Sequence, residues 1–84
     1  MRRASKVDQN QREIVDALTR CGWRWIDLTR VGGGCPDGVV QRGDVVRLVE
    51  VKATKGKLTK AQTEFHRLFS VHILRSVDDA IALR

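Results

Sequence analysis

The chain is poor in the residues that build disulfide-bonded or membrane-spanning proteins. It has two cysteines in 84 residues, Cys21 and Cys35, and their spacing matches neither a C-x-x-C pair nor a zinc site. Two thiols in a basic chain are most simply reduced and unpaired, which is typical of the cytoplasm. No apolar run approaches the roughly 20 residues that span a bilayer, and no signal-peptide core follows Met1. We therefore expect a cytoplasmic protein without a membrane partner.

Acidic residues are scarce relative to basic ones. Ten Asp and Glu face sixteen Lys and Arg, which gives a net charge of +6. Such an excess is typical of a protein that binds a polyanion, so we expect nucleic acid as the partner. A nucleotide cofactor is not expected, because the P-loop pattern G-x-x-x-x-G-K-[ST] is absent: Gly56-Lys57 is followed by Leu58 and preceded at the required distance by Val51.

The length favours one domain over residues 1–84, without repeat or linker. So short a chain buries a small core, and a symmetric homodimer is the common remedy. Trp23 and Trp25 are two residues apart, which on a strand places them on one face. They could stack on bases, but packing in the core or a dimer interface is the commoner use of such a pair.

Capping and apolar patterns predict seven elements in the order α-β-β-β-α-β-α. The first helix is capped by Ser5 or Asp8 and stops at Gly22. Strands are expected at 23–28, on each side of the turn at 42–44, and at 71–74. Two more helices begin at capping-box patterns, Thr59 with Gln62 and Ser76 with Asp79. We therefore expect an α/β fold with a central mixed sheet flanked by helices.

Three charged residues stand at the ends of the two central strands. Asp37 follows Pro36 at the start of one, and Glu50 and Lys52 end the next. Phosphodiester hydrolysis needs a hard cation, and Mg²⁺ is often held by only one or two carboxylates. An ammonium nearby can orient water or stabilise the developing phosphoryl charge. Residues 50 and 52 share a strand face, so this set predicts a magnesium-dependent phosphodiesterase.

The register decides whether Asp37 joins that face. It does so if its partner is even-numbered, such as Leu48, with Glu50 then its diagonal neighbour at roughly 7–8 Å. The sequence leaves this open, because the turn at Arg42-Gly43-Asp44 fits a loop of two, three or four residues and a bulge would shift the parity.

The motifs together resemble the PD-(D/E)xK nuclease superfamily, and within it the VRR-NUC family of small phage and bacterial nuclease domains. The resemblance rests on Gly34-x-Pro36-Asp37, Glu50-Val51-Lys52, Leu58-Thr59 and Gln62. It implies a restriction-endonuclease-like core, Mg²⁺ with Mn²⁺ as a substitute, and a substrate such as the four-way DNA junction.

The same resemblance implies a role for each site residue. Asp37 and Glu50 bind the metal with the backbone carbonyl of Val51; Lys52 is catalytic, Gln62 contributes, and Glu13 on the first helix is a further ligand. Gln62 is equally explained by the capping box, and helix 1 also offers Asp16. His66, four residues after Gln62, could reach the DNA or the site, although the helix surface is the commoner place.

Lys55, Lys57 and Lys60 flank the predicted site and are expected to contact DNA phosphates. The predicted function is therefore a metal-dependent DNA endonuclease, structure-specific on branched DNA and homodimeric. The alternatives are a nonenzymatic nucleic-acid-binding module with a nuclease-like fold, and a nicking or restriction-type nuclease acting on plain duplex.

Overall fold

The computed structural model describes residues 6–84, with side chains from residue 9 onward. The elements are α1 (Lys6–Arg20), β1 (Arg24–Asp27), β2 (Gly38–Arg42), β3 (Val45–Val51), α2 (Lys60–Leu68), β4 (Val71–Leu74) and α3 (Val77–Ala82). Their order is the one expected from the sequence. Asp8 lies inside α1 rather than before it, and Ser5 falls outside the described residues. Within residues 6–84, no helix is long and apolar enough to cross a membrane.

The four strands form one mixed sheet in the order β1-β2-β3-β4. β1, β2 and β3 pair antiparallel, whereas β3 and β4 run parallel and are joined through α2. The β2–β3 hairpin closes in two residues, since Arg42 pairs with Val45. Gly43 has φ +60°, which a two-residue hairpin turn with glycine first requires.

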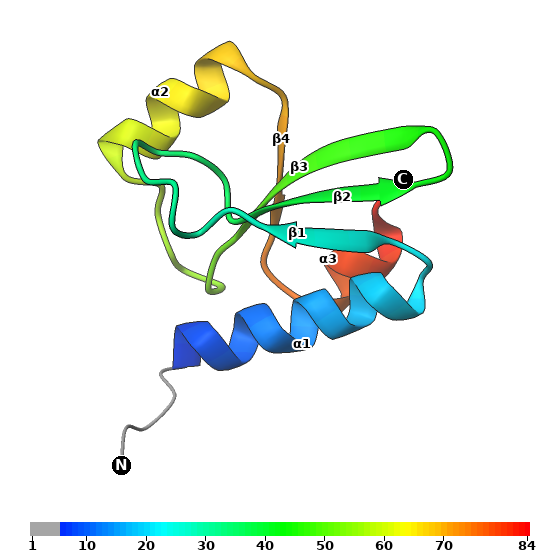
Figure 1. Cartoon of the computed structure of the whole chain (residues 1–84). Helices are drawn as coiled ribbons and strands as arrows, with labels where there is room; N and C mark the ends of the chain where they lie inside the picture. The colour runs from blue at the N-terminus through cyan, green and yellow to red at the C-terminus, as the bar shows by residue number, and fades with distance from the viewer. Residues whose placement is uncertain (1–5) are drawn as a thin grey trace.

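The core lies between one face of the sheet and the helices α1 and α3, which lie together on that side in Figure 1. It contains ten buried apolar residues: Ile14, Ala17, Leu18, Trp23, Val40, Val49, Val51, Leu74, Ala80 and Leu83. Because side chains alternate along β3, Val49 and Val51 fill this core while Glu50 projects to the other face.

α2 stands apart from α1 and α3 (Figure 1) and buries none of its own residues. Its first turn has the predicted capping box: Thr59 Oγ accepts from Gln62 N–H, and Gln62 Oε1 accepts from Thr59 N–H. The sequence therefore located this helix from local signals, and its position over the end of β3 brings it to the candidate site.

Candidate active site

The hairpin register places Asp37 beside Glu50. Gly38, the first residue of β2, pairs with Val49, and continuing this antiparallel register by one residue sets Asp37, which directly precedes β2, opposite Glu50. The effect of Asp37 on the pKa of Glu50 agrees with this closeness. An even-numbered partner was the condition for a shared face. That partner is Glu50 itself rather than Leu48, which pairs with Val39, because the turn has only two residues. The two carboxylates are therefore direct cross-strand neighbours and not diagonal ones.

Asp37 is fixed by both its side chain and its main chain. Its Oδ2 accepts a hydrogen bond from the N–H of Val51 at 2.8 Å, and its carbonyl accepts one from the N–H of Leu28 at 2.8 Å. Pro36 before it is buried. The backbone of Val51, whose carbonyl is the predicted third metal ligand, is thus tied directly to Asp37.

Glu50 is the one charged residue that is buried within the described part of the chain, at 1% exposure. Burial, and after it the hydrogen bond with Asp37 and the charge of Asp37, raise the pKa of its carboxyl group to about 8 against the opposing effect of Lys52. Its Oε1 is buried and accepts no hydrogen bond. A carboxylate buried beside a second acid without a donor is unfavourable unless a cation compensates it, so the pair fits a bound cation.

The donor set suits a hard ion that keeps its waters. Among residues 9–84, no three His, Cys, Asp or Glu side chains gather closely enough to hold a metal. Two carboxylates with a backbone carbonyl are sufficient for Mg²⁺, which demands few protein ligands. The residues present therefore fit magnesium in a partly hydrated site.

Glu13 does not join this pair, contrary to the prediction. It lines a groove between α1 and α3 with Ala17 and Ile81, and its carboxylate accepts from the amide of Gln9 at 3.4 Å. The physical reason is the helical period. Ile14 faces the sheet, and Glu13, about 100° away, lies on the edge of α1 that meets α3.

Asn10, one turn before Ile14, is the α1 residue that reaches the end of β3. Its Nδ2 donates to the carbonyl of Lys52 at 3.2 Å. This contact was not predicted, although the four-residue spacing from Asn10 to buried Ile14 was the available signal. α1 therefore contributes an amide that holds the backbone beside Lys52.

Lys52 and His66 complete the surroundings of Glu50. Burial lowers the pKa of His66, and the ammonium of Lys52 lowers it further. The same ammonium opposes the larger, upward effect of burial on the pKa of Glu50. His66 Nε2 lies 3.9 Å from Glu50 Oε1 and is also buried without a partner. His66 is therefore not a helix-surface residue; its spacing from half-buried Gln62 placed it on the inward face of α2.

The remaining predicted residues lie in the loop after β3 and in the first turn of α2. Gln62 uses its side-chain oxygen in the cap of α2, so a role in the site stays a prediction. Lys55, Lys57 and Lys60 are exposed on the loop after β3 and the first turn of α2.

Gly34 joins the loop before Asp37 to α2. It has φ +81°, and a Cβ there would collide with the carbonyl of Ala61. Only glycine allows this approach, which brings the backbone before Pro36 against the first turn of α2.

Searches against protein-family models, curated proteins and solved structures find no match to this chain.

Proposed function

We propose that this chain is a metal-dependent DNA endonuclease of the VRR-NUC type, with a restriction-endonuclease-like arrangement of its α/β elements. The observation that carries the proposal is the adjacency of Asp37 and Glu50, with the buried Oε1 of Glu50 lacking any donor. Lys52 on the same side of the sheet supports it. Structural ion pairs rarely leave a buried carboxylate oxygen unpaired.

In this proposal the metal is held by Asp37, Glu50 and the carbonyl of Val51. When bound, the ion would acidify a water and neutralise charge on the scissile phosphate. Lys52 donates to the attacking water or to a phosphate oxygen, where negative charge increases in the transition state. His66 and α2 limit the access of bulk water to Glu50, which strengthens these electrostatic interactions.

DNA is held by the exposed lysines beside the site. Lys55, Lys57 and Lys60 project from the loop and helix that follow Lys52, so they contact phosphates next to the one that is cut. The net charge of +6 adds a long-range attraction for the same partner. Branched DNA, such as a four-way junction, is the proposed substrate, in the cytoplasm of a bacterial or phage-infected cell.

The active species in this proposal is a two-fold symmetric dimer. Apolar side chains continue across the sheet face opposite the core, where Ile26 is 62% exposed and Val46 is 51% exposed. At the end of α2, Leu68 and the C-cap residue Phe69 are also more than half exposed. A second copy covering these residues removes them from water, and it supplies the second metal site that paired incisions in a junction require.

A cleavage assay tests the proposal. Plain duplex, flap and four-way junction DNA are incubated with Mg²⁺, Mn²⁺ or EDTA, and we expect metal-dependent cuts with the junction preferred. Asp37→Asn and Glu50→Gln keep side-chain size and should remove cleavage while DNA binding in EDTA is retained. Binding without cleavage of any substrate in either metal would instead identify a nonenzymatic module, and equal cleavage of plain duplex would identify a nicking or restriction-type enzyme.

A further inference from the structure

Trp25 lies in β1 and Trp23 directly precedes this strand, and the two side chains have different surroundings. Trp23 is 2% exposed, and the guanidinium of Arg42 stacks 4.3 Å from its ring centroid. Trp25 is half-buried and lines an open groove of about 410 Å³ between α1 and the β1 edge of the sheet. Of the two tryptophans, Trp25 is therefore the one that offers its ring to a ligand. A volume of this size lies within the roughly 300–1,000 Å³ typical of small-molecule sites.

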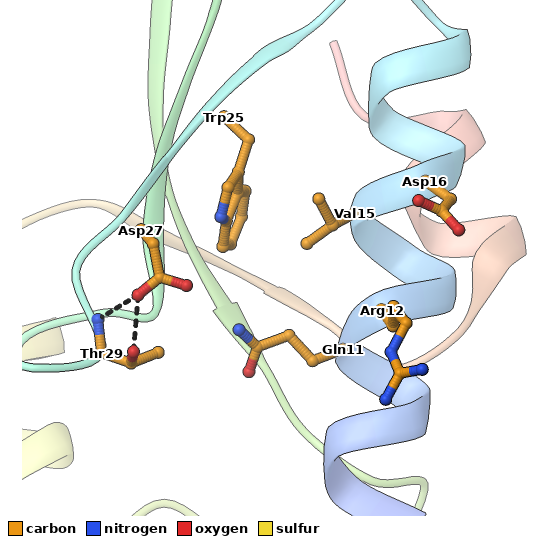
Figure 2. A pocket seen from close by; sticks show the side chains of 7 residues that line it. All are labelled: Gln11, Arg12, Val15, Asp16, Trp25, Asp27 and Thr29. Atoms are coloured by element: carbon orange, nitrogen blue, oxygen red, sulfur yellow. Dashed lines mark hydrogen bonds between the residues drawn. The ribbon is translucent and has the colours of Figure 1, made fainter. Parts of the chain in front are cut away.

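The groove has apolar sides and polar ends. Figure 2 shows Trp25 and Val15 facing each other across the opening, with the amide of Gln11 reaching below them from α1. Arg12 and Asp16 lie on the outer rim of α1 in the same view. A flat, apolar-faced ligand with polar edges fits such a slot, because its faces meet Trp25 and Val15 while its edge meets the amide.

Asp27 supplies a fixed acceptor at one end of the groove. The N–H and the hydroxyl of Thr29 both donate to its Oδ1, at 2.8 and 2.5 Å. These hydrogen bonds hold the pKa of the Asp27 carboxyl below its usual range, so it is ionised at neutral pH. Its other oxygen points toward the groove in Figure 2. The indole N–H of Trp25 also faces this carboxyl group and lowers its pKa, so an N–H donor on a ligand edge would share the acceptor with Trp25.

The charges favour a base over a phosphate inside the groove. Asp16 and Asp27 are both acidic and face only one arginine, Arg12, among the lining residues. An anionic phosphate is repelled by the two carboxylates, whereas the N–H groups of a nucleobase are attracted to them.

The groove borders the candidate active site through Gly38. The ring of Trp25 covers Gly38 so closely that a Cβ at this position would collide with it. Gly38 directly follows Asp37 in the chain. On the helix side, α1 runs from the groove to Asn10, which binds the carbonyl of Lys52. The groove and the carboxylate pair therefore lie at the same end of the sheet but on its opposite faces.

We propose that the groove between α1 and β1 binds an unpaired nucleobase, stacked on Trp25 against Val15 and hydrogen-bonded at its edge by Asp27 and Gln11. The assignment of DNA as the source of this base rests on the proposed nuclease function. Branched DNA presents such bases where strands separate.

Binding in EDTA tests the groove without cleavage. A duplex with one bulged nucleotide is compared by fluorescence anisotropy with the same duplex carrying an abasic bulge. Stacking of one base on an aromatic side chain contributes about 1–3 kcal/mol, so the base-bearing duplex should bind the wild type about ten-fold more tightly. Equal affinities would overturn the proposal. A free mononucleotide that binds as tightly as the bulged duplex would overturn DNA as the source.

Two matched variants on α1 locate the effect. Val15→Phe fills the slot opposite Trp25 and should abolish the preference for the base-bearing duplex. Thr19→Phe, at an exposed position outside the groove, should leave it unchanged. Circular dichroism confirms that both variants fold. A preference that survives Val15→Phe would contradict this location, and so would its loss in Thr19→Phe.

Measurements on the wild type distinguish a failure of the base-binding proposal from a failure of the nuclease proposal. Cleavage of the same duplexes is measured separately with Mg²⁺. A base preference in EDTA without cleavage in Mg²⁺ supports the groove and removes the nuclease proposal. Cleavage without a base preference does the reverse.

Discussion

His66 Nε2 lies 3.9 Å from Glu50 Oε1, and both atoms are buried without a hydrogen-bond partner. The pKa of the Glu50 carboxyl is raised to about 8, chiefly by burial, so in the metal-free protein this group carries a proton at neutral pH. The site is therefore organised around a carboxyl group whose charge depends on what occupies it.

The first prediction is a stability that falls with rising pH in EDTA. Below the unfolded-state pKa of 4.5 Glu50 is neutral in both states, and between 4.5 and about 8 the folded state keeps the proton that the unfolded state has lost. Stability is therefore lost as pH rises through this window. At about 1.4 kcal/mol for each pKa unit, the loss is on the order of a few kcal/mol.

Glu50→Gln isolates this effect, because the variant has no charge to bury. Urea unfolding at several pH values between 5 and 8.5 should give a steeper decline for the wild type than for the variant, and Mg²⁺ should reduce the difference. Parallel curves for the two proteins would show that Glu50 titrates normally. His66, whose pKa is lowered, contributes a slope of the opposite sign in both proteins.

Lys52→Met should separate chemistry from binding. Removing one donor aimed at developing charge typically lowers kcat by roughly 100- to 1,000-fold. DNA affinity should change little, because the exposed lysines remain. The matched control is Lys57→Met, which we expect to raise KM and spare kcat. Single-turnover cleavage with the two variants decides the matter, and wild-type kcat in Lys52→Met would refute a catalytic role.

Neutralising the exposed lysines should weaken binding to all DNA sequences alike. With Lys55, Lys57 and Lys60 replaced by glutamine, the slope of log K against log salt should flatten by about 0.9 for each lost phosphate contact. Titrations at three or more salt concentrations with two unrelated sequences measure it. Weakening confined to one sequence would indicate contacts to bases instead.

Gly34→Ala should damage the protein more than Gly33→Ala. Both glycines have positive φ, +81° and +65°, so both substitutions carry a similar backbone cost of about 1–2 kcal/mol. Only at position 34 does the added methyl group meet backbone, at Ala61, whereas at position 33 it enters open space. Chemical unfolding should show an additional loss of roughly 1–3 kcal/mol for Gly34→Ala, and similar losses would contradict the close approach.

Two experiments test the dimer: its mass in solution, and the activity of heterodimers of wild-type and inactive chains. Sedimentation at micromolar concentration should give twice the monomer mass, and Val46→Glu on the exposed sheet face should shift it toward monomer. Heterodimers of wild type with Asp37→Asn should nick a junction in one strand without resolving it. A monomer that resolves junctions would exclude the two-fold model.

Local signals in the sequence were sufficient for the order of elements. Thr59 with Gln62 and the apolar run at Val71–Leu74 depend on neighbouring residues alone, so the helix start and the strand were predicted correctly. The exact partner of Asp37 was not predictable, because it depends on the length of one turn. The places of Glu13 and His66 depended on the rotation of whole helices, which is set by packing far along the chain.

The sparse packing of α2 has a consequence for how the site opens. Nine residues are too few to form a stable helix in water unaided, and this one buries no side chain of its own. It is held by its cap, by the approach of Gly34 and by the inward face that includes His66. The amide hydrogens of α2 should therefore exchange with solvent sooner than those of β3. Local unfolding of α2 would expose Glu50 to solvent while the sheet stays folded.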